Sequence, residues 1–143
     1  MGAADRLGVS PPATGPADPA QRKARVCYDH LAGDLGVLAL DSLEKRRFVR
    51  RVDEALELTR VGREFCASLG VDPETPAGQR RPVCRPCLDW SVRRNHLAGS
   101  LGAALLHHCY ARGWAKRVPG TRVVSLSAAG ERAFRECFPE ELP

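Results

Sequence analysis

The chain has 143 residues, of which 43% are hydrophobic and 27% charged, and this length allows one core or two small units that share an interface. Its longest apolar stretches, such as Leu101–Leu106, fall far short of the ~20 residues that span a bilayer, and residues 1–20 lack the apolar core of a secretory signal. These features exclude a membrane protein and predict a cytoplasmic one, in which the six cysteines are expected to be thiols, metal ligands or a redox pair.

The formal charge of +5 is unevenly distributed along the chain. Between Gly78 and Arg122 there are nine basic residues and one acid, Asp89, so this segment has a net charge of +8. Such an excess suits contact with a phosphate backbone, although a solvated arginine-rich surface would have the same composition.

An internal repeat organises the chain. The motif HLAGDLG at residues 30–36 returns as HLAGSLG at residues 96–102, 66 residues later, and both copies continue with the same order of predicted elements. We therefore predict an α+β fold of two tandem winged-helix-like units, each with helices and a two-stranded hairpin wing. The units span residues 21–70 and 84–143, with a disordered segment at 1–20 and a proline-rich linker at 71–83.

In the first copy, leucines recur at helical spacing from Leu38 to Leu43 and predict a helix. A strand is predicted at Phe48–Val52 and a return strand at Leu56–Leu58. Thr59 is placed to cap a final helix that runs through about Leu69.

The second copy repeats this order. The predicted elements are a helix at Leu101–Gly113, a strand at Trp114–Val118, a turn at Pro119 and Gly120, a strand at Arg122–Leu126, and a helix that Ser127 caps and that ends near Cys137. Its proline-glycine turn makes this the clearer of the two wings.

Three segments resemble the C-terminal half of longer ArsR-type regulators: Arg25–Gly33, Cys87–Arg94 and His96–Gly99. The resemblance covers roughly residues 22–138. It implies a bacterial transcription regulator, in whose longer relatives a separate N-terminal winged helix binds operator DNA. We expect this chain to lack that DNA-binding domain and to be a sensor or dimerisation half.

Contact with DNA phosphates is predicted for the basic side chains near the second wing. These are Lys116, Arg117 and Arg122 on the wing, with Arg93 and Arg94 on the helix expected before it. The two helices that could serve as recognition helices carry few side chains suited to base edges, so contact without much sequence specificity is expected.

Two short motifs suggest a metal site. Cys84 and Cys87 have the spacing of a metal knuckle, and Cys27 and His30 would share one face of a predicted helix, so the four could hold zinc. Packing in the core remains the favoured alternative, because His30 and His96 are equivalent and could both fix a Leu-Ala-Gly turn. A redox switch at Cys84 and Cys87 is the third option, if nearby arginines lower the thiol pKa.

The remaining aromatic residues, including Trp90 and Phe134, are expected in the core. No phosphate-binding glycine loop, paired carboxylate motif or nucleophile elbow is present, so the chain is not expected to be an enzyme.

The sequence thus predicts a homodimeric regulator that responds to a small effector, metal or oxidant and contacts DNA. The alternatives are a protein-interaction module without DNA binding and a small zinc protein.

Overall fold

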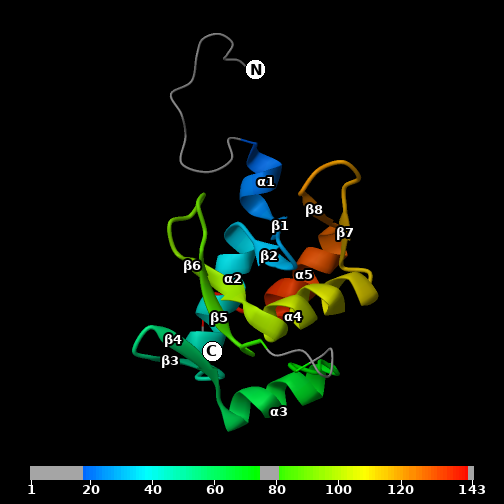
Figure 1. Cartoon of the computed structure of the whole chain (residues 1–143). Helices are drawn as coiled ribbons and strands as arrows, with labels where there is room; N and C mark the ends of the chain where they lie inside the picture. Colours follow the sequence, from blue (N-terminus) through cyan, green and yellow to red (C-terminus); the bar gives the residue numbers. More distant parts are fainter. Residues whose placement is uncertain (1–17, 75–80, 142–143) are drawn as a thin grey trace.

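The computed structural model describes residues 18–74 and 81–141 and confirms the α+β class (Figure 1). Within these ranges the chain forms five helices and four two-stranded antiparallel sheets. No helix in the described part of the chain is long and apolar enough to cross a membrane.

The elements of the first copy follow a short leading helix. They are α1 (Pro19–Lys23), β1 (Arg25–Cys27), β2 (His30–Ala32), α2 (Asp34–Lys45), β3 (Val49–Val52), β4 (Ala55–Leu58) and α3 (Arg60–Leu69). Asp18 caps α1 by accepting a hydrogen bond from the Ala20 N–H, and a proline opens the first turn.

The second copy has the same order without the leading helix. Its elements are β5 (Arg85–Leu88), β6 (Asn95–Ala98), α4 (Gly99–Ala111), β7 (Ala115–Arg117), β8 (Val124–Leu126) and α5 (Ala128–Cys137). Each copy is therefore a hairpin, a helix, a second hairpin and a final helix.

The two hairpins that were predicted as wings are present, and both predicted helix caps are confirmed. β3 pairs with β4 and β7 with β8, close to the predicted bounds. The Thr59 hydroxyl accepts a hydrogen bond from the Gly62 N–H at 3.0 Å, and Ser127 accepts one from the Gly130 N–H at 2.9 Å. These caps satisfy N–H groups that the first helical turn leaves free.

The opening of each copy differs from the prediction. Cys27 and His30 were expected on a helix but lie in the β1–β2 hairpin, and Arg93 and Arg94 lie in the β5–β6 connection. In the described part of the chain no two helices follow one another, so the helix pair of a helix-turn-helix motif is not among these elements.

The two copies interlock. Helix α2 of the first copy packs on β6 of the second, and α4 packs on β2 in return. Strand β1 also lies beside β8, where the Val26 N–H donates to the Arg122 carbonyl at 2.8 Å and the Val124 N–H to the Ala24 carbonyl at 3.1 Å. A single hydrophobic core runs through both copies.

Most of the predicted disordered segment at 1–20 and the middle of the predicted linker at 71–83 lie outside the described residues. Residues 1–17 and 75–80 belong to neither described range, and α1 begins at Pro19, inside the segment expected to be disordered.

Candidate functional site

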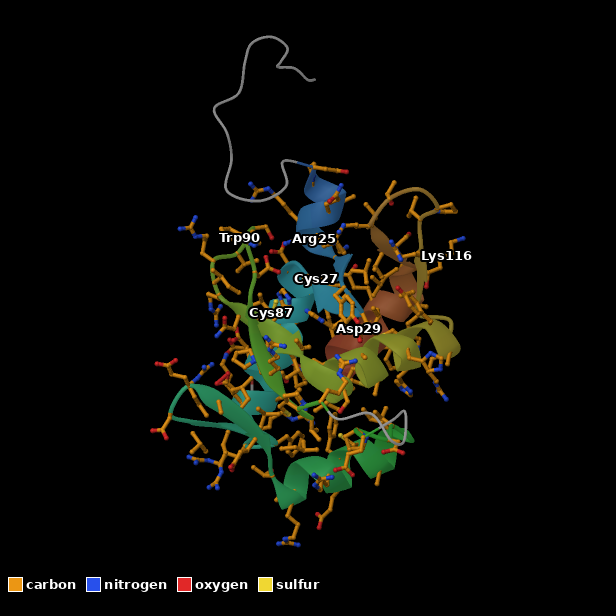
Figure 2. The ribbon with its side chains drawn as sticks, in the orientation of Figure 1. Arg25, Cys27, Asp29, Cys87, Trp90 and Lys116 are labelled. Atoms are coloured by element: carbon orange, nitrogen blue, oxygen red, sulfur yellow. The ribbon has the colours of Figure 1, made fainter. Side chains whose placement is uncertain are left out.

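Two cysteines and two histidines meet where the copies join. They are Cys27, His30, Cys87 and His96, and the four candidate ligand atoms all lie within 4.8 Å of one another. Both histidines are buried and both cysteines are half-buried. Figure 2 shows Cys27 and Cys87 on neighbouring hairpins in the middle of the molecule.

Strand register brings these side chains together. Cys27 lies directly opposite His30 in the β1–β2 hairpin, and Cys87 lies directly opposite His96 in the β5–β6 hairpin. Residues opposite one another in an antiparallel pair project from the same face of the sheet. Each copy therefore presents one thiol and one imidazole at equivalent positions.

A carboxylate supports each histidine. The distance from His96 Nδ1 to Asp89 Oδ2 is 3.0 Å, and that from His30 Nδ1 to Asp29 Oδ1 is 3.4 Å. The two aspartates are equivalent, since each follows its cysteine by two residues. The second ring nitrogens, Nε2, face each other across 3.0 Å.

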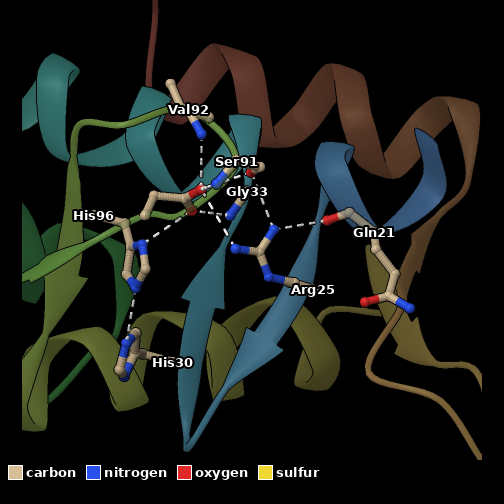
Figure 3. A network of polar contacts seen from close by, with 8 residues as sticks. Gln21, Arg25, His30, Gly33, Ser91, Val92 and His96 are labelled. Carbon is tan, nitrogen blue, oxygen red and sulfur yellow. Dashed lines mark hydrogen bonds and ion pairs between the residues drawn. The ribbon is translucent and has the colours of Figure 1, made fainter. Parts of the chain in front are cut away.

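Asp89 is the shared partner in a polar network whose other members, which include Arg25, Gly33 and His96, are labelled in Figure 3. Its side chain is completely buried and accepts hydrogen bonds from the backbone N–H groups of Gly33 at 2.5 Å, Ser91 at 2.9 Å and Val92 at 3.1 Å. The Arg25 guanidinium lies 3.4 Å away. Burial alone would raise the pKa of Asp89, but the hydrogen bonds from His96, Ser91, Gly33 and Val92 outweigh it and hold the pKa well below its usual range.

The environment of His30 disfavours the protonated ring. Burial and the neighbouring His96 lower the pKa of His30, although Asp29 opposes this shift. Asp29 itself is held by Arg81, whose Nη1 lies 2.7 Å from its Oδ2. Because Asp29 is only partly buried, this side of the network is more open to solvent than the side around Asp89.

Two glycines bring the helices close to the histidines. A Cβ atom on Gly36 of α2 would lie 3.3 Å from the His96 Cβ and 2.4 Å from the Leu31 carbonyl oxygen. A Cβ atom on Gly102 of α4 would meet the His30 Cβ at 3.2 Å and the Leu97 carbonyl oxygen at 2.5 Å. The second glycine of each HLAGxxG motif thus permits a close helix approach across the two copies.

We expect Gly36→Ala to lower the free energy of unfolding by about 1–3 kcal/mol, because the added methyl group has no room beside a backbone carbonyl. The sign of the stability change is informative, because replacing glycine with alanine stabilises a helix by about 1 kcal/mol where space is open. Urea denaturation measures the difference. Unchanged or higher stability would contradict the close approach of α2.

Cys84, which the sequence placed in the metal site, lies elsewhere. It is buried just before β5, outside the cluster, and His96 occupies the fourth position instead. The predicted lowering of the thiol pKa is wrong as well. Burial raises the pKa of Cys84 to about 12, and burial together with the neighbouring Cys27 raises that of Cys87 to about 11.

The predicted DNA-contacting side chains are all exposed. Lys116 and Arg117 lie on β7 and Arg122 in the turn that follows, whereas Arg93 and Arg94 lie between β5 and β6. Arg94 pairs with Asp41 of α2. Trp90 was expected in the core, but its place in the β5–β6 connection leaves it 59% exposed.

Sequence reasoning did not identify His96, Asp29 or Asp89 as members of this site. The signal that could have found them is the duplicated order of a cysteine, an aspartate two residues later, and the histidine of the HLAG motif. This order spans four residues in the first copy, from Cys27 to His30, and ten in the second, from Cys87 to His96. The two segments therefore do not align without a gap.

The fold and site define a duplicated α+β protein whose halves meet at a buried cluster of thiols, imidazoles and carboxylates. Among known proteins, the chain is similar to the "Uncharacterized HTH-type transcriptional regulator YdfF" of Bacillus subtilis (strain 168), with 42% identity over 113 residues. The match covers 79% of this chain and 50% of that protein, so the chain spans about half the length of this curated relative. No protein-family model matches the chain, and no solved structure does.

Proposed function

We propose that the chain is part of a bacterial transcriptional regulator of the ArsR type, corresponding to its sensor or dimerisation half, and that it works in the cytoplasm. The observation that carries this proposal is the 42% identity to a protein named as an HTH-type transcriptional regulator. The likeness of residues 22–138 to the C-terminal half of longer ArsR-type regulators supports the finer assignment.

Non-specific contact with DNA phosphates is the part of this function that the chain's own surface supports. Lys116, Arg117 and Arg122 are exposed on the β7–β8 hairpin, and no ion pair neutralises them within residues 18–74 and 81–141. The equivalent β3–β4 hairpin differs, because Arg50 pairs with Glu57 and Arg51 with Glu44. Among the described residues, the basic side chains of the second wing therefore have no ion-pair partner, whereas Arg50 and Arg51 of the first are paired.

DNA binding by the full chain tests this contact. We expect a fluorescently labelled duplex of arbitrary sequence to be bound at low salt and released as salt rises. In the Arg117→Ala, Arg122→Ala variant, the slope of log K against log salt should become shallower by about 1.8, because each phosphate contact contributes about 0.9. Fluorescence anisotropy at several salt concentrations measures both quantities.

The matched control is the Arg50→Ala, Arg51→Ala variant on the other hairpin, which removes the same charge and should leave the slope unchanged. An equal effect of both variants on the salt slope would show that DNA binding depends on the overall charge of the chain and not on the second wing. If no duplex binds even at low salt, the second wing does not contact DNA.

A second candidate function is association with another protein, either a second copy of the chain or a different partner. Three large hydrophobic side chains support it, since Tyr28 is 85%, Leu88 48% and Trp90 59% exposed on the β1–β2 and β5–β6 hairpins. Exposed apolar side chains of this size are enriched at protein interfaces. Absence of salt-dependent DNA binding in the experiment above would favour this candidate.

A further inference from the structure

We propose that Cys27, His30, Cys87 and His96 form a closed tetrahedral zinc site that holds together the two internal repeats of a single chain. The proposal does not depend on the function proposed above, because it rests on the geometry of the cluster alone.

The separations suit a single small ion. In a tetrahedral site with Zn–S of about 2.3 Å and Zn–N of about 2.0–2.1 Å, the ligand atoms lie roughly 3.3–3.8 Å from one another. The four candidate atoms here fall within 4.8 Å of each other, and the two Nε2 atoms are 3.0 Å apart. Shifts of a few tenths of an ångström to about 1 Å would bring all four into contact with one ion.

The orientation of the imidazoles suits a metal ion between them. Asp89 accepts hydrogen bonds from three backbone N–H groups and is therefore an ionised acceptor, so His96 Nδ1 carries the proton toward it. Asp29, paired with Arg81, is placed to accept from His30 Nδ1 in the same way. When both rings are neutral, both Nε2 atoms then present lone pairs to each other at 3.0 Å.

Two lone pairs at that distance repel unless a positive charge lies between them, either a proton on one ring that makes a hydrogen bond to the other, or a metal ion. A metal ion supplies that charge and uses both lone pairs as ligands. The carboxylates on the far side of each ring complete the arrangement that metal-bound histidines favour, in which the other N–H donates to an acceptor that fixes the ring.

The choice of zinc follows from the donor set. Two thiolates and two imidazoles in a compact cluster favour zinc over the hard cations Mg²⁺ and Ca²⁺, which require oxygen ligands. With all four positions taken by protein side chains, the site is of the closed, structural kind.

Duplication explains why the site has this composition. Each copy contributes one thiol and one imidazole from opposite positions of a hairpin, so neither copy alone can hold the ion. The metal would join β2 to β6 at the place where α2 packs on β6 and α4 packs on β2. Metal release would loosen the junction between the copies.

The experiment uses the full chain, purified without chelator. We expect one zinc per chain by elemental analysis. After zinc is removed, titration with Co²⁺ should give the visible bands of a tetrahedral ion and a thiolate charge-transfer band with the intensity of two thiolates. No bound zinc combined with no tetrahedral Co²⁺ spectrum would overturn the proposal, as would a Cys27–Cys87 disulfide in the freshly purified protein.

Variants locate the site. Cys87→Ser and His96→Gln are each expected to weaken Co²⁺ binding by at least about 100-fold, and Asp89→Asn by about 10–100-fold through its effect on His96. Cys84→Ala is the matched control, since it removes a buried cysteine outside the cluster and should leave the spectrum unchanged. Equal loss in the control would overturn the assignment.

Circular dichroism of each variant reports whether it folds. If Cys87→Ser does not fold, Cys27→Ser tests the same thiolate pair from the other hairpin. If neither folds, the number of thiolates in the wild-type Co²⁺ spectrum decides the question, because a spectrum without two thiolates contradicts the site.

Discussion

Replacing Asp89 with alanine should lower the free energy of unfolding by about 3–5 kcal/mol, which is typical of breaking a buried, hydrogen-bonded charge pair. The carboxylate is completely buried and is the acceptor for the N–H groups of Gly33, Ser91 and Val92. Alanine would leave these donors and the buried Arg25 guanidinium without their partner. Each such loss costs about 1–3 kcal/mol, and more when a charge is involved.

The equivalent residue of the first copy is the matched control. Asp29 is 31% exposed, and its main partner, Arg81, is 25% exposed, so Asp29→Ala should cost only about 1 kcal/mol. Urea denaturation of both variants in buffer with a chelator measures the hydrogen-bond network without a metal contribution. Similar losses in the two variants would show that the network around Asp89 is not the main anchor.

Local signals allowed the β3–β4 and β7–β8 hairpins and the helices that follow them to be predicted. Thr59 and Ser127 cap their helices through their own hydroxyls. Before each cap, a basic strand pairs with the next strand in the sequence, β3 with β4 and β7 with β8. Interactions of this range depend on neighbours in sequence, which a single sequence displays.

The hairpins that open each copy could not be predicted in this way. Strand β1 has three residues, and its two-residue turn places Tyr28 at φ 59°, where glycine or asparagine is the usual signal. The β5–β6 connection is held by the Asp89 carboxylate, which accepts from the backbone N–H groups of Ser91 and Val92. Its folding depends on one side chain and carries no hydrophobic periodicity.

The candidate site was found in part. Cys87 was predicted from the knuckle spacing of Cys84 and Cys87, and Cys27 and His30 from helical spacing, although they meet across a hairpin instead. His96 replaces Cys84 because cross-strand register and the contact between the copies decide which side chains meet. Neither of these is visible in the spacing of one motif.

Phe134→Ala should remove about 3–5 kcal/mol from the free energy of unfolding, the usual cost of truncating a buried phenylalanine. The side chain is 1% exposed, and its ring centroid lies 4.9 Å from that of Phe138. It also lines the small cavity that Gly36 and Gly102 border. Since small domains have only about 5–15 kcal/mol of stability in total, this one change would remove a large share.

The form of the unfolding curve tests whether both copies share one core. A single core predicts one cooperative transition, with far-UV circular dichroism and tryptophan fluorescence coinciding before and after the change. Both tryptophans lie in the second copy, so two separate transitions would show that the copies unfold independently. The control is Val61→Ala on α3, which truncates a side chain that is 47% exposed and should change stability by less than about 0.5 kcal/mol.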